Sequence, residues 1–178
     1  MLKKILKIFR VEYGSFWRNV SDYRSLFGSF GGIAFSPYFH FACISAALVV
    51  FFSDKPDAWM QATQGMLPEL LGFSLGGYAI LISFGDEQFR KFLATFYPNG
   101  NKHSIFMILN GVFLHFIIAQ VLAILISVFI SAYDIKNIYV NFIGCMAFFY
   151  AASFCIAVAF EVKSVSSWYQ NYVKTMNK

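Results

Sequence analysis

The chain has 178 residues, of which 58% are hydrophobic and 13% are charged. Soluble domains contain about a quarter charged residues, so roughly half of the usual charge is missing. This composition excludes a soluble enzyme, a disordered chain and a disulfide-stapled secreted module, and it predicts an integral membrane protein.

An amphipathic helix is expected within residues 1–32, before the first membrane span. Apolar and aromatic side chains recur there every three or four residues, and basic side chains occupy another face. This pattern is typical of a helix that lies in the headgroup region. Its aromatic residues, Trp17 among them, either anchor the helix at the interface or bind a partner.

Four apolar stretches are long enough to cross about 30 Å of hydrocarbon as helices, which takes about 20 residues. They cover residues 33–52, 66–85, 104–133 and 138–160. These continuous runs lack the alternation of barrel strands, so the predicted fold is an all-α membrane protein with four transmembrane helices. Residues 161–178 are expected to form a cytoplasmic tail that continues the last span.

The distribution of basic residues predicts the orientation in the membrane. Of the 14 Lys and Arg residues, 12 lie in residues 1–32, 86–103 and 161–178. The other two connections hold only Lys55 and Lys136. The positive-inside rule therefore places both termini in the cytoplasm. We expect a multi-pass protein of the bacterial inner membrane that contacts anionic lipid and has no direct nucleic-acid partner.

Two further aromatic stripes are predicted on the cytoplasmic side. Phe89 and Phe92 lie on one face of a short predicted helix, and Trp168 and Tyr172 lie on one face of the tail. Exposed aromatic patches tend to be covered by another surface. Together with Trp17, these residues predict either interface anchors or a docking surface for a cytoplasmic protein.

Small residues at four-residue steps predict close helix packing. Gly72 and Gly76 form a GxxxG pair in the second span. The fourth span carries a small face with the same step, made of Ala147, Ala151, Cys155 and Ala159. Such faces let helices approach closely within a chain or between copies, so we expect a homo-oligomer.

Three polar side chains within the spans are candidates for a pore or gate. Glu69 is the only acidic residue in the predicted spans, and Asn110 and Gln120 lie in the third. An intramembrane carboxylate is by default a candidate functional group. The structural alternative is that Pro68 occupies the first turn of a helix, where Glu69 would complement the positive helix end and reach the headgroups.

Two chemical alternatives stay open. His40 and His115, in the first and third spans, could ligate a haem in a b-type cytochrome-like redox subunit. Residues 72–76 match the G-x-S-x-G pattern of hydrolases, but Ser74 is expected within a continuous helix instead of a strand-to-helix turn. The three cysteines lack metal-ligand spacing. We therefore expect a non-enzymatic protein with no metal and no cofactor.

The stretch from Leu67 to Glu87, LPELLGFSLGGYAILISFGDE, resembles a pattern in small four-span inner-membrane proteins of bacteria. Proteins of that size and topology occur as membrane subunits of anti-phage defence systems, such as the membrane component of Kiwa. The resemblance implies an oligomeric component that senses damage or perturbs the bilayer together with a cytoplasmic partner. A stand-alone small channel or transporter is the alternative function.

Overall fold

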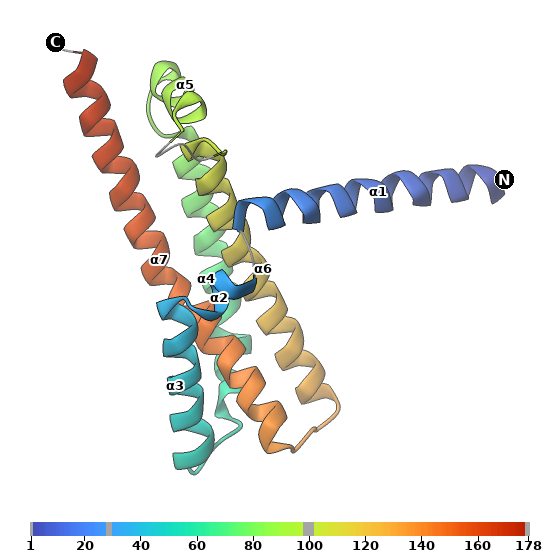
Figure 1. Cartoon of the computed structure of the whole chain (residues 1–178). Helices are drawn as coiled ribbons and strands as arrows, with labels where there is room; N and C mark the ends of the chain where they lie inside the picture. The colour runs from blue at the N-terminus through green and yellow to red at the C-terminus, as the bar shows by residue number, and fades with distance from the viewer. Residues whose placement is uncertain (1, 28–29, 98–101, 177–178) are drawn as a thin grey trace.

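The computed structural model describes residues 2–27, 30–97 and 102–176. Within these ranges the regular elements are all helices, as the sequence predicts, and Figure 1 shows their arrangement. In chain order they are α1 (Leu2–Phe27), α2 (Phe30–Ala34), α3 (Pro37–Phe52), α4 (Ala58–Ser83), α5 (Glu87–Thr95), α6 (Ile105–Ala132) and α7 (Ile138–Met176).

Three of these helices, α4, α6 and α7, are long and apolar enough to cross a membrane. The first predicted span is a shorter helix, because Ser36 and Pro37 interrupt the apolar run that begins at residue 33. The Ser36 hydroxyl accepts a hydrogen bond from the amide of Phe39, and Pro37 occupies the first turn, where its missing N–H costs nothing. The 16 residues of α3 measure about 24 Å.

The helix that contains the second predicted span begins eight residues before the predicted start of that span. α4 starts at Ala58, so Pro68 lies inside the helix, and its interpretation as a first-turn proline is wrong. Trp59 and Thr63 are buried in the added turns, which explains why this moderately polar segment folds as helix. Glu69 is consequently about 16 Å from the first residue of α4 and about 21 Å from the last.

The helices that contain the third and fourth predicted spans begin within one residue of the predicted starts. Ser104 caps α6 by accepting a hydrogen bond from the amide of Met107. α7 begins at Ile138 and continues unbroken to Met176, so its 39 residues measure about 58 Å. The predicted tail is therefore helical and continuous with the last span.

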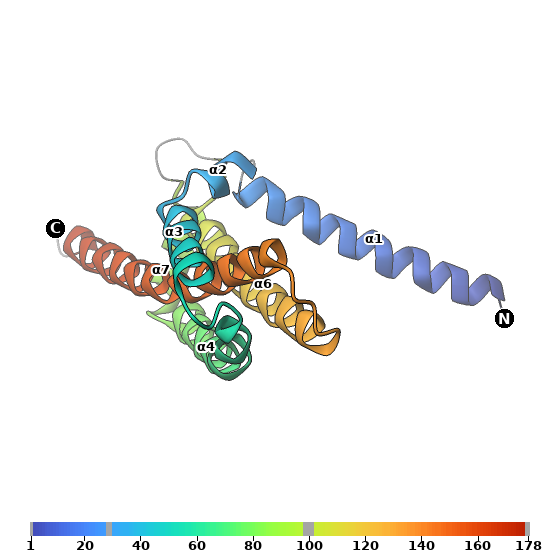
Figure 2. The same cartoon turned by 90° about the horizontal axis from the view of Figure 1, so that it is seen from below.

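α7 is the central helix of a bundle: α3, α4 and α6 all pack against it, and α4 also packs along α6 (Figures 1 and 2). Ala42 and Ala46 of α3 and Ala151 of α7 are fully buried. Gly144 provides the slot for the indole of Trp59, since a Cβ built on this glycine would lie 2.2 Å from the ring. Small residues thus set the spacing around α7.

α1 leaves the bundle sideways and contacts it through its C-terminal turns (Figures 1 and 2). There Leu26 packs on Gly111 of α6, where an added Cβ would lie 3.1 Å from the Leu26 Cβ. Farther from the bundle, Phe16 and Trp17 are exposed, Trp17 by 64%. The part of α1 beyond its last turns therefore presents an apolar surface that the bundle does not cover.

Candidate functional site

One exposed face of α4 carries small and polar side chains along most of the helix. We name it the α4 stripe, and its residues lie within an arc of about 80°. No atom lies within 4 Å of a Cβ built on any of its three glycines. The stripe consists of Gln61, Gly65, Glu69, Gly72, Gly76, Ala79 and Ser83, all exposed.

The opposite side of α4 is joined to α6 by pairs of polar side chains. Gln64 Nε2 donates to Ser127 Oγ over 3.2 Å, and Gln120 Nε2 donates to Ser74 Oγ over 3.3 Å. Nearer the α5 end of the bundle, the hydroxyl of Tyr78 donates to Asn110 Oδ1 over 2.8 Å. Such hydrogen bonds hold membrane helices together at about 1 kcal/mol each.

The three candidate pore residues are therefore not brought together within one chain. Gln120 is fully buried between helices. Its Oε1 accepts no hydrogen bond from the described residues. Glu69 lies five residues before Ser74, about 140° away around α4, and is exposed. Asn110 and Gln120 form contacts between helices, whereas Glu69 lies on the exposed face of α4.

Neither of the two chemical alternatives matches the geometry. Ser74 lies inside a helix, and its hydroxyl donates to the carbonyl of Leu70 over 2.8 Å, so the strained turn of a hydrolase nucleophile is absent there. Both ring nitrogens of His115 are hydrogen-bonded to tyrosine hydroxyls, whereas His40 is exposed. Among the described residues, no group of three or more His, Cys, Asp or Glu is placed to hold a metal ion.

The bonds of His115 join three helices. Its Nδ1 is hydrogen-bonded to the hydroxyl of Tyr23 on α1, and its Nε2 lies 2.8 Å from the hydroxyl of Tyr150 on α7. Burial raises the pKa of Tyr23 above its ordinary value of 10.0, so the phenol is neutral at physiological pH. Sequence reasoning missed both tyrosines, because 92 and 35 residues separate them from the histidine.

The small face predicted on α7 is only partly used within the chain. Ala151 is fully buried, Ala147 and Cys155 are half-buried, and Ala159 is exposed. Ala151 lies in one buried cluster with Ala46 and Val50 of α3, which packs along α7. The α4 glycines differ, because no atom of a neighbouring helix lies within 4 Å of a Cβ built on them.

The aromatic stripes of α5 and α7 pack against each other. Phe89 has no exposed surface, and its ring centroid lies 5.0 Å from that of Tyr169 and 5.6 Å from that of Tyr172. Phe92 lies 5.5 Å from Tyr172, and Trp168 packs on the same cluster. The interpretation of Phe89 as a docking residue is therefore wrong, since its partner is the chain's own tail.

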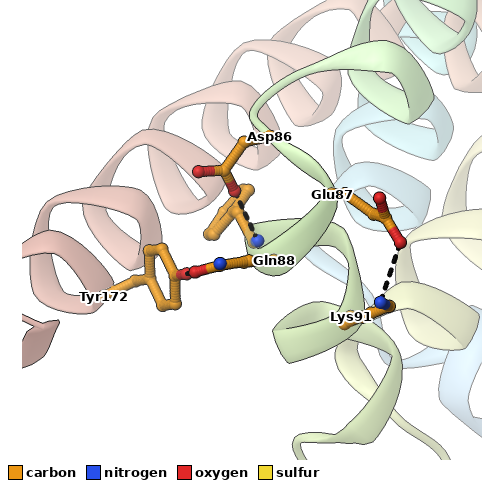
Figure 3. Close-up of polar contacts among 6 residues, drawn as sticks. Asp86, Glu87, Gln88, Lys91 and Tyr172 are labelled. Atoms are coloured by element: carbon orange, nitrogen blue, oxygen red, sulfur yellow. Dashed lines mark hydrogen bonds and ion pairs between the residues drawn. The ribbon is translucent and has the colours of Figure 1, made fainter.

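Polar contacts fix the position of α5 over this cluster (Figure 3). The Asp86 carboxylate accepts a hydrogen bond of 2.7 Å from the amide of Phe89 and so caps the helix. The hydroxyl of Tyr172 donates to Gln88 Oε1 over 3.3 Å, and Lys91 and Glu87 form an exposed ion pair at 2.7 Å. Of these three contacts, the hydrogen bond between Tyr172 and Gln88 joins the loop helix to α7, and the other two stabilise α5 itself.

No match to the chain was found among protein-family models, curated proteins or solved structures. Its function is therefore inferred from its own geometry. Two surfaces are not covered by contacts within the described chain: the α4 stripe with the Glu69 carboxylate, and the apolar face of α1.

Proposed function

We propose that the protein is a non-enzymatic, multi-pass protein of the bacterial inner membrane whose copies assemble through the α4 stripe. In this proposal α3 is a fourth span, whose length of about 24 Å is accommodated by slight local thinning of the bilayer. Both termini are cytoplasmic, because 12 of the 14 basic residues lie at the end of the bundle with α5 or in α1 and its linker.

The position of Glu69 carries this proposal. A carboxylate near the middle of a membrane helix costs about 2.5–3.5 kcal/mol when it faces lipid. Three glycines lie on the same face as Glu69, and no neighbouring helix comes within 4 Å of a Cβ built on any of them: Gly65, Gly72 and Gly76. Such small residues let helices of two copies approach closely. Assembly through the stripe removes the carboxylate from lipid and gathers the Glu69 side chains of several copies around a shared path, where they control ion passage.

α1 fits the membrane surface in this arrangement. It meets α6 at Gly111, and from there to Ala132 α6 measures about 32 Å, close to the thickness of the hydrocarbon layer. α1 therefore lies along the inner surface, with Trp17 among the headgroups. α5 and the end of α7 project beyond it and form the surface that a cytoplasmic partner would meet.

The assembly is tested with the double variant Gly72→Leu/Gly76→Leu, measured by light scattering in mild detergent. Because no atom lies near either glycine, the variant should fold normally and run as a protomer of 20.3 kDa plus detergent. The matched control, Leu75→Phe/Ile82→Phe, alters exposed residues of α4 outside the stripe and should keep the wild-type mass. An unchanged mass in the glycine variant would show that the copies associate elsewhere.

The pore role is tested separately with Glu69→Gln in liposomes that report ion flux. Loss of the charge should change flux at least about tenfold if the carboxylates line the path. Glu87→Gln on exposed α5 is the control and should conduct like the wild type. Equal flux in all three proteins would remove the pore role and leave assembly unaffected.

The role in phage defence rests on the sequence resemblance, and plaque counts with the double glycine variant test it.

A further inference from the structure

A cavity of about 570 Å³ lies between the end of α1 and helices α2, α3, α6 and α7. Along α6 its wall extends from His115 to Ile126, which is 11 residues or about 16 Å. Its volume is within the range of pockets that bind small molecules. α4 contributes no residue to its lining, so the cavity is separate from the α4 stripe.

One end of the cavity is polar. Tyr23 and Arg24 of α1, His115 of α6 and Tyr150 of α7 line it, and the histidine is only 6% exposed. The two tyrosine hydroxyls and the imidazole form the hydrogen-bonded group described above. Arg24 is exposed and takes part in neither of the ion pairs found in the described ranges, so its guanidinium is available to an anion.

The remainder of the cavity is apolar and follows the direction of α6. Ile118, Leu122 and Ile126 line it on successive turns of that helix. Small side chains make the space, with Ala119 and Ala123 on α6 and Ala147 on α7. The site is therefore a slot with the Arg24 guanidinium at its rim and apolar side chains along its depth.

We propose that this slot holds one acyl chain of an anionic phospholipid of the inner leaflet, with the lipid phosphate at Arg24. A guanidinium binds phosphate oxygens through paired, charge-assisted hydrogen bonds. Basic pockets between membrane helices on the cytoplasmic side are typical sites for anionic headgroups. The chain reaches about half of the roughly 30 Å hydrocarbon layer, which is the depth of one leaflet.

The lipid joins α1 to the bundle, because α1 supplies Arg24 and Val20 while α6 and α7 supply the apolar wall. The position of α1 therefore depends on the anionic lipid content of the inner leaflet. This inference rests on the membrane embedding proposed above and not on assembly through α4.

Native mass spectrometry of the full chain in detergent tests the proposal, with dioleoylphosphatidylglycerol and dioleoylphosphatidylcholine as probes. These lipids share their acyl chains and differ in headgroup charge. We expect one phosphatidylglycerol per chain, bound about tenfold more tightly than phosphatidylcholine. Arg24→Gln should abolish that preference, whereas Arg18→Gln, an exposed residue of the same helix outside the slot, should keep it. Equal affinity for both lipids in the wild type, or a preference unchanged in Arg24→Gln, would overturn the headgroup assignment.

A second variant tests the slot itself. Ala147→Phe fills the cavity and should lower binding of both lipids, whereas Ala159→Phe on the exposed part of α7 should not. Unchanged stoichiometry in Ala147→Phe would place the bound lipid elsewhere, and displacement by free oleate at equal concentration would identify a free amphiphile as the ligand. The same spectra give the oligomer mass, so loss of lipid selectivity and loss of assembly are read independently.

Discussion

Replacement of Gly144 by alanine should destabilise the bundle, although alanine is the better helix former. An added Cβ would lie 2.2 Å, 2.4 Å and 2.9 Å from three carbon atoms of the Trp59 ring. Ordinary contact requires about 3.5–4.0 Å, so the rigid indole must move by more than about 1 Å. Trp59 is 3% exposed, so this displacement disturbs the packing of α4 on α7.

The magnitude follows from three contributions. Overpacking of a buried site costs about 1–3 kcal/mol. The 3.4 Å hydrogen bond from Trp59 Nε1 to Asn141 Oδ1 is already long and would be lost, which costs about 1 kcal/mol. Alanine returns about 1 kcal/mol through its higher helix propensity. The free energy of unfolding of Gly144→Ala should therefore fall by about 1–3 kcal/mol.

The measurement is reversible unfolding by SDS in mixed micelles, followed by the emission of Trp59 after Trp17 and Trp168 have been replaced by phenylalanine. Gly77→Ala is the control, because no atom lies within 4 Å of its added Cβ, and it should be neutral or slightly stabilising. The Trp59 emission maximum should shift to longer wavelength only in Gly144→Ala. Equal stability of the two variants would refute the packing role assigned to this glycine.

Three further substitutions test other contacts. Tyr23→Phe removes the hydroxyl that is hydrogen-bonded to His115, so a spin label on α1 should become more mobile. Burial raises the pKa of Tyr23, so the wild type should keep this contact up to about pH 10 and lose it as the pH rises through the raised pKa. Phe89→Ala should lower the free energy of unfolding in denaturant by about 3–5 kcal/mol. Phe96 is half-exposed, so Phe96→Ala should lower it by less than about 1 kcal/mol. Similar losses in the two variants would show that Phe89 does not hold α5 on α7. Ser74→Ala should cost about 1 kcal/mol in the wild type but nothing in a Gln120→Leu background, and additive losses in this double-mutant cycle would show that the two side chains do not interact.

The starts of α6 and α7 were predictable because local sequence determines them. Ser104 is an N-cap directly before an uninterrupted apolar run, and Ile138 begins the next run after a short polar turn. The start of α4 was not predictable by the same reasoning. Hydropathy measures the fit to lipid, but Trp59 and Thr63 are helical because they are buried against neighbouring helices.

The sites were harder to predict than the spans, because periodicity shows that a face exists but not what covers it. The Phe89 stripe appears as an exposed surface in sequence, yet its cover, Tyr169, lies 80 residues farther along the chain. The same limit applies to the lipid slot, whose polar end brings together Tyr23, His115 and Tyr150 from three separate segments. No local sequence motif predicts this hydrogen-bonded group.

The glycines of the three long helices fall into two groups, those covered within the chain and those left uncovered. Gly111 and Gly144 each lie against a side chain that occupies the space a Cβ would take, so the bundle itself accounts for them. Gly72 and Gly76 have no such neighbour, and each gives up about 1 kcal/mol of helix propensity relative to alanine. They also share their face with Glu69, which lipid solvates poorly. The proposed contact with a second copy at this face would account for both the glycines and the carboxylate, whereas lipid at this face would account for neither.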